Sequence, residues 1–81
     1  MASTKRPQAF QTAFGKALRR RRERLEMSQE ALAFTSEIHR TYISELERGL
    51  KNPSLTTIDR LAAALKTKAS TLIADAEAEL G

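Results

Sequence analysis

The sequence has no cysteine and only one histidine, His39, among its 81 residues. These shortages exclude a disulfide framework, a thiolate metal site and a multi-histidine metal site. Long apolar runs are also missing: none approaches the roughly 18 residues that span a bilayer, and the basic N-terminus precedes no apolar signal core. We therefore expect a single cytoplasmic domain with no membrane partner, no bound metal and no cofactor.

Strand signals are absent as well, because the chain shows no alternating β-branched run and no Asn-Gly or Asp-Gly turn. Alanine, leucine, glutamate and arginine, which favour helices, dominate instead. The predicted fold class is all-α, a compact five-helix domain over residues 8–81 that follows a flexible basic arm over residues 1–7. The helices are expected at residues 7–25, 28–35, 40–48, 54–65 and 69–79.

Capping residues support these boundaries. Ser28 and Ser54 are good N-caps for the second and fourth helices, and Gly49 suits the end of the third because glycine readily adopts a positive φ. The spacing of apolar residues predicts where the core lies. Four large apolar side chains are expected in it: Phe10, Phe14, Phe34 and Leu55.

The formal net charge of +4 is unevenly distributed. Residues 1–24 are rich in arginine and lysine, whereas the charged residues of positions 69–81 are all acidic: Asp75, Glu77 and Glu79. This asymmetry predicts one face suited to polyanions and one kept away from them. Because consecutive helical residues point around the axis, only one or two arginines of the run, such as Arg19 or Arg24, are expected to reach a phosphate.

The most informative stretch, residues 28–49, reads SQEALAFTSEIHRTYISELERG. Two short helices joined by a tight turn allow the second to lie in a DNA major groove while the first crosses the backbone. The apolar residues expected to hold this pair together are Leu32, Ala33, Ile38, Ile43 and Leu46. The polar residues expected to point outward from the second helix are Arg40, Thr41, Ser44 and Glu45.

This stretch resembles the phage repressor and Cro-like (Xre-type) helix-turn-helix family, whose pattern SQ-x-x-LA…Y-I-S-x-x-E-x-G-x-x-x-P-S is matched nearly throughout. The similarity covers about residues 14–73. The segments HRTYIS, LERG and NPSL are also similar to controller proteins of restriction–modification systems. The resemblance implies a sequence-specific regulator of transcription that binds double-stranded DNA through a recognition helix from Arg40 to Arg48.

The resemblance also implies roles for individual residues. Arg40 can donate two hydrogen bonds to O6 and N7 of guanine, and Thr41 can bond a base edge or pack on the methyl group of thymine. Ser44, one turn further on, is placed to reach a base or a phosphate. The implied phosphate contacts are Gln29, His39, Tyr42, Lys51 and Asn52, and Arg22 with Glu47 matches an ion pair that joins the first helix to the recognition helix.

Several positions depart from the family pattern. Glu26, Glu37 and Lys66 stand where the family places glycine, so any positive φ there adds strain. Arg21 replaces an apolar residue, which predicts that the first helix exposes more of its surface. His39 replaces the usual serine or threonine N-cap of the recognition helix and caps it less well.

The predicted function is a homodimeric regulator reading a pseudo-palindromic operator, because one recognition helix reads too few base pairs for useful specificity. The dimer contact is expected on the last helix, through Leu72, Ile73, Ala76 and Leu80. A second hypothesis is a protein-interaction module, such as an antitoxin or adaptor, which the acidic tail supports. An enzyme is not expected, since the chain offers no nucleophile–base pair, metal ligands or phosphate loop, and no small-molecule ligand is expected either.

Overall fold

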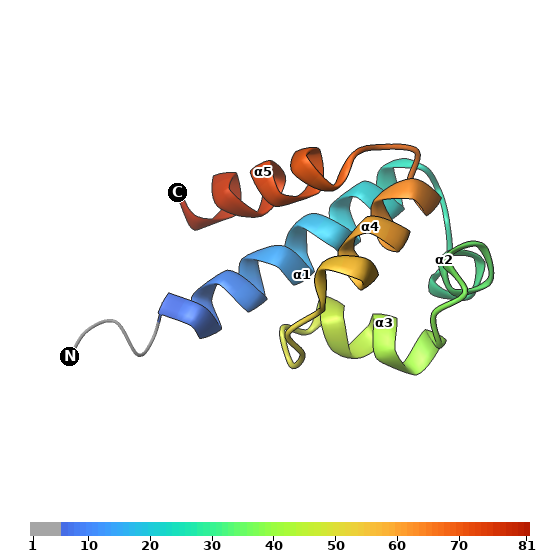
Figure 1. The fold of residues 1–81 in the computed structure, drawn as a ribbon, viewed down its shortest axis with the longest axis horizontal. Helices are drawn as coiled ribbons and strands as arrows, with labels where there is room; N and C mark the ends of the chain where they lie inside the picture. The colour runs from blue at the N-terminus through green and yellow to red at the C-terminus, as the bar shows by residue number, and fades with distance from the viewer. Residues whose placement is uncertain (1–5) are drawn as a thin grey trace.

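Helix α1 (Arg6–Arg24) is the longest element of the computed structural model, which describes residues 6–81. Helix α5 (Ala69–Leu80) lies along it, and α3 (Arg40–Glu47) packs against its other side (Figure 1). Helix α2 (Gln29–Ser36) contacts both α3 and α4 (Leu55–Ala64), and α4 in turn contacts α5. The predicted all-α, five-helix architecture is confirmed over the described residues.

Every helix contributes to one core. Its largest fully buried side chains are Leu18, Leu32, Ile43, Leu46, Leu61, Leu65 and Leu72. Burying such a side chain stabilises a fold by about 1.5–3 kcal/mol, so these residues supply much of the driving force for packing the helices. Over residues 6–81 no helix combines the length and the apolar character needed to cross a membrane.

The N-termini of α2 and α4 are capped as the sequence predicts. The Ser28 hydroxyl accepts a hydrogen bond from the Ala31 amide at 2.9 Å, and the Ser54 hydroxyl accepts one from the Thr57 amide at 3.1 Å. His39, at the start of α3, makes no such bond. The first turn of α3 therefore keeps amide groups that no side chain caps in the described chain.

Four chain reversals after helices use a residue in the left-handed region. The backbone φ is 58° at Glu26, 60° at Glu37, 76° at Gly49 and 60° at Lys66. In each case the next amide donates to a carbonyl five residues back, as a Schellman turn requires. The three non-glycine residues adopt the same left-handed geometry as Gly49, so the condition under which the sequence predicts strain at these positions is met.

Gly15 allows α1 and α3 to approach closely. A Cβ atom at this position would collide with the carbonyl oxygen of Leu46 and would lie 2.7 Å from that of Glu47. Both are backbone atoms at the end of α3, and no rotamer change can move them aside. Nothing in the sequence pattern marks Gly15, because only the packed structure shows what its missing side chain would meet.

Two core predictions are wrong. Phe34 is 88% exposed and Leu55 is 84% exposed, whereas Phe14 is buried and Phe10 partly buried. The buried side of α2 is set by Leu32 and Ser36, and a residue two positions after Leu32 points to the opposite side of a helix. Leu55 is the first residue of α4, where the described chain supplies no element to cover it.

The predicted basic arm is shorter than expected where the structure describes it. Arg6 and Pro7 belong to α1, and proline fits this first turn because its missing amide hydrogen has no helical acceptor there. The remaining arm residues, 1–5, lie outside the described residues.

Candidate nucleic-acid interface

Helices α2 and α3 pack together as a two-helix unit. Leu32 of α2 is fully buried together with Ile43 and Leu46 of α3, while Ala33 and Ile38 are partly buried against this cluster. Three residues link the two helices, and the left-handed Glu37 turns the chain between them. These are the apolar residues that the sequence analysis assigned to the contact, and they fix the direction in which α3 presents its polar side.

The polar side of α3 begins at its first turn. Arg40 and Thr41 are exposed, and Ser44 is half-buried one turn later. Glu45 is also half-buried. The guanidinium of Arg40 has one weak contact within the described chain, at 3.4 Å from Oε1 of Gln29, and is otherwise available to a ligand. The three predicted base readers therefore lie within two turns of one helix.

Behind this surface, one carboxylate connects three segments of the chain. Glu47, near the end of α3, accepts hydrogen bonds from Arg22 Nε at 2.6 Å and from Arg22 Nη2 at 3.0 Å. It also accepts one from the Gln29 amide at 2.9 Å. Arg22 in addition donates to the carbonyl oxygen of Met27 at 2.8 Å, which ties α1 to the turn before α2.

This ion pair is well shielded from water, with side-chain exposures of 11% for Arg22 and 4% for Glu47. The hydrogen bond to Glu47 raises the pKa of the Arg22 guanidinium above its usual range, and this effect outweighs the opposing effect of burial. The shift favours the charged form of Arg22 beside Glu47. The structure contains the ion pair that the family resemblance implies.

The predicted phosphate contacts lie on three parts of this surface. Gln29 begins α2, and His39 and Tyr42 flank the start of α3. His39 is exposed, whereas the Tyr42 ring is partly buried against the core. One amide hydrogen of Gln29 is used by Glu47, which leaves its second N–H for a ligand.

The other two predicted phosphate contacts, Lys51 and Asn52, are exposed in the loop that follows α3. This loop lies at the opposite end of α3 from Arg40. The structure thus places polar groups at both ends of the recognition helix.

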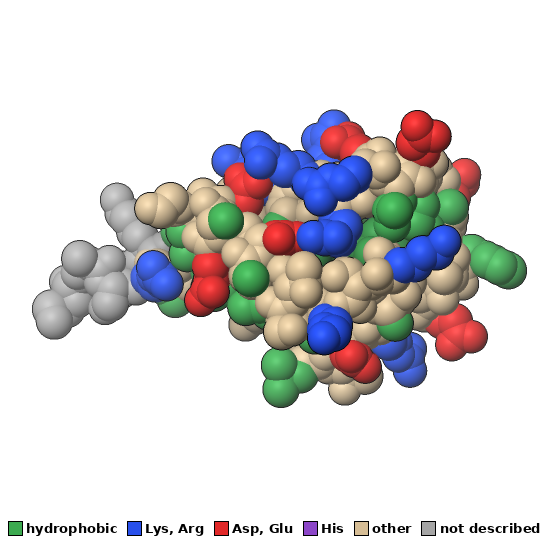
Figure 2. Space-filling model, turned by 90° about the horizontal axis from the view of Figure 1, so that it is seen from above, with side chains coloured by type: hydrophobic (Ala, Val, Ile, Leu, Met, Phe, Trp, Pro, Cys, Tyr) green, Lys and Arg blue, Asp and Glu red, His purple; other side chains and the backbone are tan. Residues whose placement is uncertain are grey.

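The arginine run of α1 pairs with acids of the protein itself, which corrects the expected separation of charges. Arg19 bonds Glu23 at 3.0 Å on the same helix. Arg20 contacts Glu79 at 2.8 Å, and Arg21 contacts Asp75 at 2.8 Å, so two acidic residues of α5 each pair with an arginine of α1. On the face seen in Figure 2, basic side chains accordingly lie beside acidic ones.

Arg21 also corrects the expectation that this position turns more of α1 toward solvent. Its Nε and Nη2 atoms both donate to the Asp75 carboxylate, at 3.0 and 2.8 Å. The residue joins α1 to α5 through an ion pair where an apolar side chain was expected. The pair could have been anticipated only by knowing that α5 lies along α1.

The four apolar residues predicted to form a dimer contact on α5 divide into two kinds. Leu72 and Ala76 are fully buried inside the protomer. From its sequence, α5 is expected to carry more apolar residues than the protomer can cover. This does not hold for Leu72 and Ala76, because their side chains pack against the core of their own protomer. Ile73 and Leu80 retain exposed surface.

Comparison with known proteins adds independent information. A family model described as helix-turn-helix matches residues 18–72, which include α2, the turn and α3. Over 61 residues the chain is 44% identical to the control protein C.BamHI of Bacillus amyloliquefaciens, covering 74% of this chain and 75% of that protein.

Two solved structures of controller proteins are similar in fold to this chain. The restriction-modification controller protein C.AhdI from Aeromonas hydrophila superposes with a TM-score of 0.75 at 42% identity, over 76% of this chain and 94% of that one. The controller protein C.Esp1396I, solved as a tetramer with its natural 35 base-pair operator, superposes with a TM-score of 0.80 over 88% of this chain and 93% of that chain. Its sequence identity is 24%, so this second likeness concerns the fold.

Proposed function

Because this chain belongs to the helix-turn-helix family of DNA-binding regulators, we propose that it is a homodimeric transcriptional regulator that reads a pseudo-palindromic operator. The observation that carries this proposal is the exposed polar start of α3, held on a buried framework. Arg40 and Thr41 face solvent, while Ile43 and Leu46 of the same helix are fully buried. A helix anchored in this way can enter the major groove without losing its attachment to the protein.

In this proposal, the residues that contact bases are Arg40, Thr41 and Ser44. Arg40 suits guanine, because its planar guanidinium can donate to O6 and N7 together. The long contact to Gln29 lies at the limit of a hydrogen bond and gives way readily to a base. Thr41, one residue on, suits a thymine methyl group or a base edge.

Phosphate contacts hold the helix in register. Gln29, His39 and Tyr42 lie around the start of α3, and Lys51 and Asn52 lie beyond its end. The uncapped amides of the first turn of α3 also favour an anion. Contacts at both ends fix the angle at which the helix lies in the groove and carry no sequence information themselves.

Homodimerisation follows from the small number of base pairs within reach of one α3. Two copies related by a two-fold axis double the site, and they place the half-sites about 10 base pairs apart, one turn of DNA. The relatives also favour a particular biological role, since C.BamHI is a control protein and C.AhdI is a restriction-modification controller protein. We propose the same role for this chain, acting in the cytoplasm where the genome is accessible.

The decisive test selects bound sequences from a random pool of duplex DNA with the purified protein. We expect one enriched motif with two inverted half-sites, and binding that weakens steeply between about 50 and 200 mM salt because phosphate contacts release counterions. Failure to enrich any motif, with no duplex binding near 100 mM salt, would overturn the proposal. In that case the protein-interaction hypothesis would remain. Its original support, the acidic tail, is weakened because Asp75 and Glu79 pair with α1.

A further inference from the structure

Glu45 places a carboxylate on the polar side of the recognition helix. Thr41, Glu45 and Arg48 follow one another at the spacing i, i+4 and i+7, so their side chains share one side of α3. Ile43 and Leu46, which are fully buried, lie on the opposite side. Glu45 is therefore a neighbour of Thr41 on the surface that the proposed function turns toward DNA.

The carboxylate of Glu45 has no hydrogen bond and no ion pair within residues 6–81. Four other carboxylates of this part of the chain each pair with an arginine: Glu23, Glu47, Asp75 and Glu79. Arg48, three residues after Glu45, directs its Nε atom to the carbonyl oxygen of Ser44 at 3.4 Å instead. Glu45 thus keeps the full acceptor capacity of its two oxygens for a ligand.

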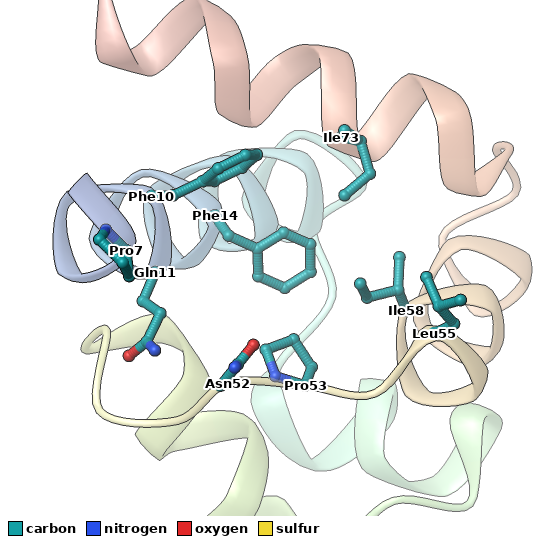
Figure 3. A pocket seen from close by; sticks show the side chains of 9 residues that line it. All are labelled: Pro7, Phe10, Gln11, Phe14, Asn52, Pro53, Leu55, Ile58 and Ile73. Atoms are coloured by element: carbon teal, nitrogen blue, oxygen red, sulfur yellow. The ribbon is translucent and has the colours of Figure 1, made fainter. Parts of the chain in front are cut away.

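The backbone around Glu45 is restrained by contacts beyond it in the chain. Its carbonyl oxygen accepts a hydrogen bond from the Leu50 amide at 2.9 Å, in the turn that ends α3. The next two carbonyl groups along the helix pack against Gly15 of α1. In the loop that follows, Pro53 lines a small apolar hollow together with Phe14 of the core (Figure 3). Such support is what a side chain that distinguishes bases requires.

A carboxylate in the major groove discriminates among the bases because it accepts hydrogen bonds and cannot donate them. Cytosine presents its N4 amino group there, whereas guanine and thymine present acceptor atoms that repel a negative charge. Adenine presents an amino group beside the acceptor N7, so it suits a carboxylate less well than cytosine does. The phosphates repel the same charge, and a carboxylate that finds no donor weakens binding. Cytosine is the base that best offsets this cost.

Helix geometry indicates which base pair Glu45 meets. The four residues from Thr41 to Glu45 advance by about 6 Å along the helix, and successive base pairs are about 3.4 Å apart. The two side chains therefore reach base pairs within about two steps of each other. Arg40 and Glu45 point about 140° apart around the helix axis, so they meet different base pairs.

We propose that Glu45 is a specificity-determining residue that selects cytosine within about two base pairs of the position read by Thr41 and discriminates against guanine and thymine there. This inference rests on the proposed function and adds a base contact to those of Arg40, Thr41 and Ser44. Each protomer of the proposed homodimer then requires one such cytosine in its half-site.

The test selects bound sequences from random duplex DNA with wild-type protein and with the Glu45→Gln variant. Glutamine has nearly the same size, and its amide pairs with N6 and N7 of adenine. We expect a cytosine in each half-site of the wild-type motif, and adenine at the same position of the variant's motif. In the wild-type operator, exchanging this cytosine for guanine or thymine should weaken binding about 5- to 150-fold. Glu45→Ala should tolerate the exchange.

Two controls accompany the selection. Glu77→Gln removes the same charge from an exposed position of α5, which lies on the other side of α1 from α3 (Figure 1). This variant should enrich the wild-type motif at every position. The base preference that depends on Arg40 should persist in the Glu45→Gln variant, and its persistence shows that the recognition helix is intact.

The outcomes separate this inference from the proposed function. If wild-type protein enriches no motif, the proposed function fails and the inference fails with it. If a motif is enriched but Glu45→Gln and Glu45→Ala leave every base preference unchanged, or change binding to all sequences by one factor, Glu45 is only a surface charge and the inference alone is wrong. A wild-type preference for any base other than cytosine at the position where these variants alter selectivity would overturn it as well.

Discussion

Arg22 of α1 and Glu47 of α3 meet through two parallel hydrogen bonds, 2.6 Å from Nε to Oε2 and 3.0 Å from Nη2 to Oε1. The pair is nearly inaccessible to water, and it joins the longest helix to the recognition helix. Gln29 bonds the same carboxylate and also touches Arg40. The position of a proposed base reader is thus linked through three side chains to the framework of the domain.

Replacing Arg22 with methionine should destabilise the protein by about 3 kcal/mol, since the Glu47 carboxylate would stay buried without its partner. Urea unfolding measures this change. The matched control is Arg19→Met, which removes an exposed pair with Glu23 on the same helix and should alter stability by less than about 1 kcal/mol. Equal effects of the two substitutions would show that burial of the Arg22 pair has no energetic consequence.

Replacing Arg40 with alanine should weaken operator binding by about 1–3 kcal/mol and relax the preference at one base pair of each half-site. The measurement is binding to the selected operator and to variants of it at each position. Lys51→Ala serves as comparison, because losing a phosphate contact should weaken binding to all sequences alike and reduce its salt dependence. A uniform loss for Arg40→Ala would assign Arg40 to a phosphate.

Replacing Gly15 with alanine should destabilise the fold by about 1–3 kcal/mol, although alanine is normally the better residue inside a helix. The added methyl group would meet backbone carbonyl groups of Leu46 and Glu47, and α1 and α3 would have to separate. Thermal unfolding tests this expectation beside Lys16→Ala, an exposed neighbour on the same helix. An equally stable Gly15→Ala variant would show that the two helices can shift apart freely.

Replacing Lys66 with glycine should stabilise the protein by about 0.5–1 kcal/mol, because glycine removes the left-handed strain at a φ of 60°. Lys66→Ala is the control, since it shortens the side chain and keeps the Cβ atom that causes the strain. Chemical denaturation should rank the glycine variant above both wild type and the alanine variant. The reverse ranking would mean that the flexibility of glycine in the unfolded chain outweighs the relief of strain.

Much of the fold could be predicted from local sequence. The capping serines, Gly49 and the apolar spacing predict five helices close to those observed, because capping and amphipathic packing are properties of neighbouring residues. Glu26, Glu37 and Lys66 could be identified as strained because the resemblance marks those positions for glycine. The same resemblance predicted the Arg22–Glu47 pair, which spacing alone does not indicate.

The errors arise where packing between distant segments decides. The sequence predicts Phe34 and Leu55 to be core residues because their side chains are large and apolar. Both are exposed, because each points to a side of its helix that packs against no other helix of the described chain. In the sequence, Arg20 and Arg21 belong to an apparently unpaired basic run. Their acidic partners lie on α5, more than 50 residues away along the chain, so local sequence does not indicate the pairs. For the candidate site, the family resemblance places Arg40 and Thr41 on the outward side of the recognition helix, and both are exposed in the structure.

The tight contact at Gly15 has a consequence for the range of operators that the protein can accept. With carbonyl groups of α3 packed against Gly15 of α1, we expect rolling or sliding of the recognition helix within its own protomer to be restricted. An operator with a longer or shorter spacer between half-sites must then be accommodated where the two protomers join. In the proposed homodimer, spacer tolerance is therefore expected to be a property of the dimer junction, and substitutions there should change it without altering the bases that each half-site prefers.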